Sequence, residues 1–193
     1  MSSWNLIRWC GMAALVAGVL AIVVDLIVLA VFGFGQSLDE VLVSSGLLLR
    51  SAVAPLAEAL LLLGLVGLYA RQSEATGLPG LASFLVAFVG TVLAQGFVLA
   101  GLLADLGWAL FGVASLQGRV YPRAASILLI VGAVGTGVAS AFPRGEPGGL
   151  LMYAVVGADV ILNVAIIWFG LELFTRRRVE GPRQASQSSR GGD

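Results

Sequence analysis

The chain has 193 residues, of which 59% are hydrophobic and 11% charged, and its mean hydropathy is +0.99. A soluble domain of this length needs more polar surface than that composition supplies, so lipid is the solvent for most of the chain. Eleven arginines balance eleven acidic residues, which leaves no basic excess to bind nucleic acid.

Two residue types on which many enzymes depend are absent, because the sequence contains neither histidine nor lysine. The usual general base and metal ligand are therefore missing, as is the amine that forms Schiff bases with retinal or pyridoxal cofactors. The single cysteine, Cys10, has no partner for an intrachain disulfide. We expect a protein without enzymatic activity, without a cofactor and without a metal site.

The first element in the chain is an apolar run over residues 11–34, preceded by Arg8. It is longer than the roughly 7–15 apolar residues of a signal peptide, and no small-residue cleavage site closes it. We expect a retained first transmembrane helix. Beyond it, Ser37–Glu40 has the pattern of a capping box, which predicts a short helix starting at Leu38.

The remaining apolar runs are separated by turn residues at Gly77–Gly80, at Tyr121–Pro122 and over residues 143–147. One boundary is less distinct, because Leu81 to Gly118 is a continuous apolar stretch. As a single helix it would be roughly 57 Å long, against a hydrocarbon core of roughly 30 Å. Two helices joined near Gly101 fit better. The sequence thus predicts six spans, over about residues 11–34, 52–70, 79–100, 102–118, 124–142 and 150–174.

The arginines indicate the orientation of these spans. With six spans and a cytoplasmic N-terminus, the cytoplasmic side receives most of the arginines that flank the spans, as the positive-inside rule favours. These are Arg8, Arg71, Arg119, Arg123 and Arg176–Arg178. We therefore predict an all-α polytopic membrane helix bundle over residues 1–178, with both termini cytoplasmic. Residues 179–193 are rich in Arg, Ser and Gly, which predicts a disordered cytoplasmic tail.

Three cytoplasmic helix ends resemble one another, each with a leucine three residues before Arg71, Arg119 or Arg176. The likeness is compatible with three up–down hairpins in a parallel repeat, as some transporters have. The alternative is convergence, because every inward helix end favours an arginine. The short matches do not separate these two interpretations.

Four acidic residues fall inside the predicted spans, where charge is costly: Asp25, Glu58, Asp105 and Asp159. Counted from the cytoplasmic arginines, all four lie roughly 20–26 Å above that border, in one layer of the outer half of the bilayer. Gln95 and Asn163 lie at similar depth. This layer is the candidate ion or proton site.

Each carboxylate also has a structural explanation. Glu58 and Asp105 could reach the outer interface and be solvated, which we favour for these two. Asp25 and Asp159 could hydrogen-bond to neighbouring helices and hold them together, and for this pair the two interpretations are evenly balanced. In the fifth span, Gly132, Thr136 and Ser140 share one face, which predicts close packing in the middle of the bundle.

The run Gly64–Gln72 and the glycine-containing turn after it resemble small multi-pass membrane proteins of prokaryotes that have no assigned activity. The resemblance covers about residues 60–140, implies a prokaryotic cell membrane, and transfers no functional residue. Two functions remain open. The first is action by association, as a homo-oligomer or as an accessory subunit that binds other membrane helices. The second is a small proton- or cation-coupled transporter or channel that uses the intramembrane carboxylates.

Overall fold

The structure is a computed structural model that describes residues 3–33, 45–94, 98–141 and 150–175. Regular structure in these segments is entirely α-helical. Long apolar runs fold this way because lipid offers the backbone no hydrogen-bond partners, so each segment must supply its own. The helices are α1 (Ser3–Gly33), α3 (Ser45–Leu93), α4 (Val98–Gly118), α5 (Arg123–Ala141) and α6 (Leu150–Thr175).

Each of these five helices contains a stretch that is long and apolar enough to cross a membrane. The prediction of an all-α chain with several such helices is therefore confirmed. The predicted helix at Leu38, the polar residue Gln95 and the tail at 179–193 lie outside the described residues.

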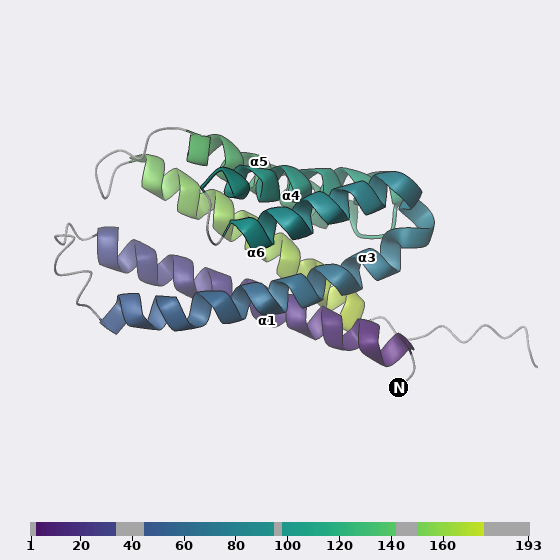
Figure 1. Cartoon of the computed structure of the whole chain (residues 1–193), viewed down its shortest axis with the longest axis horizontal. Helices are drawn as coiled ribbons and strands as arrows, with labels where there is room; N and C mark the ends of the chain where they lie inside the picture. The colour runs from purple at the N-terminus through teal and green to yellow at the C-terminus, as the bar shows by residue number, and fades with distance from the viewer. Residues whose placement is uncertain (1–2, 34–44, 95–97, 142–149, 176–193) are drawn as a thin grey trace, which may run out of the picture.

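Helix α3 turns back at Gly77. Gly77 has φ 53° and ψ −134°, a backbone conformation that residues with a Cβ rarely adopt. Pro79 follows, where its fixed φ suits the first turn of a new helical stretch. Tyr69 and Phe84 stack with ring centroids 4.5 Å apart, whereas a straight helix would separate them by roughly 22 Å. We call residues 45–76 the first arm of α3 and residues 78–93 its second arm (Figure 1).

The helices pack side by side in a ring. The first arm of α3 lies against α1 and the second against α4; α4 then packs on α5, α5 on α6, and α6 on α1. Figure 1 shows α6 crossing obliquely between the upper and lower parts of this ring. The largest fully buried side chains form the core: Leu65, Leu68, Phe111, Leu129, Ile166 and Phe169.

Glycines let neighbouring helices approach closely. A Cβ on Gly107 of α4 would lie 2.2 Å from the backbone nitrogen of Ala87 in the second arm. A Cβ on Gly90 of that arm would lie 2.4 Å from the backbone nitrogen of Ala104. Small residues thus set the distance between α3 and α4, as is common where membrane helices pack.

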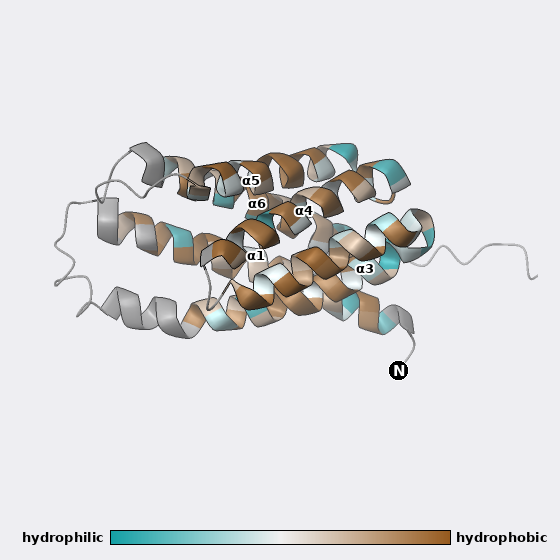
Figure 2. Ribbon diagram, turned by 45° about the horizontal axis from the view of Figure 1, so that its top comes forward, coloured by the Kyte–Doolittle hydropathy of each residue, from teal (hydrophilic) through white to brown (hydrophobic). Residues whose placement is uncertain are grey.

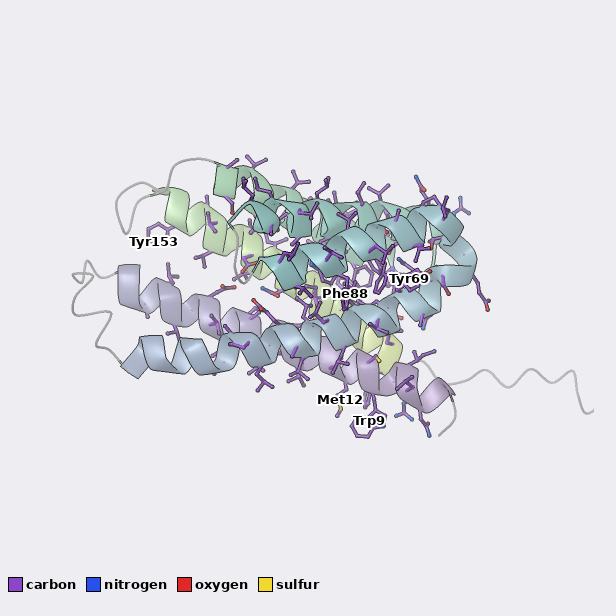
Figure 3. The ribbon with its side chains drawn as sticks, viewed as in Figure 1. Trp9, Met12, Tyr69, Phe88 and Tyr153 are labelled. Carbon is purple, nitrogen blue, oxygen red and sulfur yellow. The ribbon has the colours of Figure 1, made fainter. Side chains whose placement is uncertain are left out.

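The outward faces of the helices are apolar. Leu63, Leu99 and Leu106 are more than half exposed, and Figure 2 shows hydrophobic residues along most of each helix. Hydrophilic residues gather at the end of the bundle where α3 turns (Figure 2). In Figure 3, Trp9 and Met12 point away from the bundle, whereas Tyr69 and Phe88 lie between helices. Such surfaces suit a lipid environment.

Two details differ from the sequence-based expectations. The join between the third and fourth predicted spans lies between Leu93 and Val98, so the prediction of a join near Gly101 is wrong. A Cβ on Gly101 would meet no atom within 4 Å, and the helix simply continues through it. Helix α5 is also not central: it packs on α4 and α6 and exposes Ile127 and Val131, while α6 touches α1, α3 and α5.

Candidate functional site

Three of the predicted acidic residues, all half-buried, lie in the same region of the bundle. Asp25 of α1 and Asp159 of α6 lie close enough for their side chains to interact. Asp105 of α4 lies close enough to Asp159 for the two carboxyl groups to interact electrostatically. We call Asp25, Asp105 and Asp159 the carboxyl cluster. Helices α4 and α6, which carry Asp105 and Asp159, both pack on α5.

Small residues allow these side chains to approach one another. A Cβ on Gly18 would lie 2.6 Å from Ile167 and 3.0 Å from the backbone oxygen of Asn163, so α1 and α6 are in close contact just below the Asp25–Asp159 pair. Opposite Asp105, a Cβ on Gly137 of α5 would lie 3.4 Å from the Asp105 Cβ and 3.6 Å from its Oδ2. The missing side chain at Gly137 thus leaves room for the Asp105 carboxyl group.

A direct hydrogen bond between the Asp25 and Asp159 side chains would require a proton. An ionised carboxylate only accepts hydrogen bonds, so two ionised aspartates cannot bond to each other directly. A carboxyl–carboxyl bond therefore contains a proton on one partner, and Asp105 adds a third oxygen-rich group nearby. The arrangement can hold, share and release a proton. Among the described residues, no group of three or more His, Cys, Asp or Glu residues could hold a metal ion.

The other predicted site residues lie around this cluster or on other elements. Asn163 is buried, one turn along α6 from Asp159. Glu58 is half-buried on the first arm of α3, an arm that packs on α1. The candidate residue Gln95 falls in the segment that the structure does not describe.

A second group of polar side chains, which the sequence did not single out, lies at the end of the bundle where α3 turns. We call Arg71, Gln72, Ser115 and Tyr121 the turn-end polar cluster. The Ser115 hydroxyl lies 2.8 Å from the Gln72 Oε1, and the Tyr121 hydroxyl donates to the Leu68 carbonyl at 3.1 Å. The Arg71 guanidinium lies over the Tyr121 ring, 5.5 Å from its centroid.

The sequence signal for this cluster was weak. In the sequence, Arg71 is an expected interfacial cation and Tyr121 an expected turn residue, and Gln72 follows Arg71 at a helix end where polar residues are common. In the structure Gln72 and Ser115 are fully buried. The contact between Gln72 and α4 depends on the turn at Gly77. Residue spacing within each helix therefore does not predict it.

An apolar groove on the surface differs in character from both polar groups. It has a volume of about 410 Å³ and lies between α1 and the first arm of α3. Its lining is apolar apart from the Cys10 thiol and includes Trp9 and Met12, which Figure 3 shows on the outer side of α1. None of its lining residues is charged, so the groove does not suit an ion.

Comparison of the chain with protein-family models, with curated proteins and with solved structures yields no match.

Proposed function

We propose that this chain is a six-span protein of a prokaryotic cell membrane with both termini in the cytoplasm. The turn at Gly77 supports the count, because it divides the long helix α3 into two arms that each extend away from the turn. The distribution of arginines supports the orientation, since Arg71, Arg119 and Arg123 all flank turns at one end of the bundle.

Within this topology, we propose that the protein is a small proton-coupled transporter or channel and not an enzyme. The observation that supports this function is the proximity of the Asp25 and Asp159 side chains, because two neighbouring carboxyl groups can share one proton. Intramembrane carboxyl groups that face the interior of a bundle are typical of proton relays. Asp105 strengthens the case, because it places a third carboxyl group near Asp159.

Action by association is the second candidate function. The apolar groove between α1 and α3 supports it, because an apolar side chain of another membrane helix would fit a hollow of this size. In this case the Asp25–Asp159 contact would serve only to hold α1 and α6 together. The two functions differ in whether the pair must exchange its proton.

Proton flux into liposomes distinguishes the two functions. The purified protein is reconstituted with a pH-sensitive dye inside the vesicles, and a pH gradient is applied. We expect Asp25→Asn and Asp159→Asn to fold, because an amide can still hydrogen-bond to the remaining carboxyl group, and to lose at least about nine-tenths of the flux. Glu74→Gln is the matched control, since Glu74 is an exposed acid at the turn end.

Two results would contradict proton coupling. One is a wild-type protein that is folded in liposomes and produces no flux above that of empty vesicles. The other is an Asp25→Asn variant whose flux equals that of the wild type. Either result would favour the association function, which predicts that both Asp→Asn changes are nearly silent.

A further inference from the structure

Gln72 has an unusual environment for an amide in a membrane protein. Its side chain is fully buried, and its Nε2 has no hydrogen-bond partner among the described residues. Ser126 of α5 is also fully buried, and its Oγ has no partner among them either. Buried polar groups are nearly always hydrogen-bonded, so each of these two atoms requires an explanation.

Reversing the Gln72 amide does not remove the problem. The Ser115 hydroxyl lies 2.8 Å from the Gln72 Oε1 and 2.8 Å from the Phe111 carbonyl, but a hydroxyl has only one hydrogen to donate. If Ser115 donates to Phe111, the amide reverses so that its nitrogen donates to Ser115, and the amide oxygen is then left over. In either orientation, therefore, one polar atom of the Gln72 amide, the nitrogen or the oxygen, has no hydrogen-bond partner among the described residues.

Gln72 and Ser126 approach the same part of α4. Gln72 reaches α4 at Ser115, while a Cβ on Gly112 would lie 3.2 Å from the backbone oxygen of Ser126. Gly112 and Ser115 are three residues apart and so share a face of α4. Ser126 and Gln72 thus approach the same face of α4 about one helical turn apart, where α3, α4 and α5 come together.

We propose that an ordered water molecule binds at this junction, between the Gln72 amide, Ser115 and the Ser126 hydroxyl. Water fits because it can donate or accept, whereas an anion or a cation would suit only one orientation of the amide. On the basis of the proposed function, this water is a proton-holding site nearer the cytoplasm, and the carboxyl cluster is a second one nearer the outside. We call them the inner and the outer proton station. The two stations lie roughly 15 Å apart along α4, from Asp105 to Ser115, with Trp108 and Phe111 between them.

The direction in which a substitution at Gln72 shifts the melting temperature tests the water site. Gln72→Met keeps the length of the side chain and removes the amide. If the junction is dry, this change removes an unsatisfied amide and raises the melting temperature in detergent. If water is bound, the change removes a ligand of that water, and we expect a loss of roughly 3 °C or more. Ser73→Ala is the control, because Ser73 is adjacent but only half-buried, and its hydroxyl donates to the Ala70 carbonyl of the same helix.

A double-mutant cycle with Ser126→Ala tests whether one water contacts both residues. A shared water predicts that Ser126→Ala has a clearly smaller effect in the Gln72→Met protein than in the wild type. A rise in melting temperature for Gln72→Met, or strictly additive effects, would overturn the water site.

Proton flux tests the role of this water as the inner proton station. In the liposome assay we expect Gln72→Met to reduce the flux at least about tenfold and Ser73→Ala to leave it unchanged. If Gln72→Met lowers the melting temperature but leaves the full flux, the role of the water as a proton station is overturned. The water site itself is then retained. Absence of flux in the wild type would contradict the proposed function, and the melting temperatures would still decide the water site.

Discussion

The absence of a Cβ atom at single glycines determines how closely α3 and α4 approach each other. At Gly107 the place of a Cβ is occupied by the backbone of Ala87, which cannot swing aside as a flexible side chain would. Gly101 lies in the same helix, and a Cβ there would meet nothing within 4 Å. Two glycines of one helix thus have opposite packing environments.

We therefore expect opposite results from the same substitution. Gly107→Ala should destabilise the fold by about 1–3 kcal/mol, because α3 and α4 must move apart. Gly101→Ala should be neutral or stabilise it by up to about 1 kcal/mol, because alanine favours the helix. Unfolding in mixed micelles with a denaturing detergent measures both values. Equal effects of the two changes would show that the helices are not in contact at Gly107.

At this scale the sequence indicates a common layer for the acidic residues but not the directions in which their side chains point. Counting along each helix placed Asp105 in the same layer as Asp25 and Asp159, and proximity to the outer interface favoured solvation for it. In the structure, Asp105 is half-buried opposite Gly137 and close enough to Asp159 for the two carboxyl groups to interact, and its solvation stays a prediction. Which way a residue faces depends on how the ring closes, and nearly uniform apolar helices show no polar face from which to predict it.

At the scale of the element, the turn in α3 depends on a backbone conformation. The φ of 53° and ψ of −134° at Gly77 are accessible to glycine at little cost, whereas a Cβ clashes with the backbone there. No atom lies within 4 Å of where that Cβ would be, so any effect of substitution comes from the backbone alone.

Gly77→Ala should accordingly lower the stability by about 1–3 kcal/mol without any steric contact to another helix. The stacked pair Tyr69 and Phe84 gives a local readout, because opening the turn separates the rings. Detergent unfolding measures the loss, and Ala75→Gly, two residues earlier, is a control that alters helix propensity only. An unchanged stability would mean that the turn tolerates a left-handed residue with a side chain.

The turns between helices were predicted more reliably from the sequence than the other helix boundaries. Gly77 and Pro79 mark the turn in α3, and Tyr121–Pro122 mark the one before α5, because these residues restrict the backbone locally. The join after α3 was placed too late, at Gly101, because an isolated glycine in an apolar run is tolerated inside a helix. The packing of α5 at the side of the ring depended on contacts with α4 and α6, which residue spacing alone does not specify.

At the scale of the whole molecule, the two polar groups lie at different depths. The carboxyl cluster and the turn-end polar cluster are separated by the buried apolar core, which includes Phe111, Leu129 and Ile166. With the proposed orientation, the turn-end cluster lies towards the cytoplasm and the carboxyl cluster towards the outside.

Cysteine labelling tests this orientation. In a Cys10→Ala background, we expect Ser73→Cys and Ser188→Cys to react with a membrane-impermeant maleimide only after the cells are opened. Ser37→Cys should react in intact cells, because the loop after the first span is expected outside. Labelling of Ser188→Cys in intact cells would require an odd number of spans and would contradict the six-span proposal.

The contact between α1 and α6 closes the ring, and it determines when the molecule becomes complete during synthesis. The arms of α3 meet soon after they emerge from the ribosome, since Tyr69 and Phe84 are close in sequence. Asp25 and Asp159, in contrast, come from the first and the last of the described helices, so they come together only after the rest of the chain has been inserted. An unfinished chain therefore lacks the proximity of Asp25 and Asp159 on which the proposed proton coupling rests.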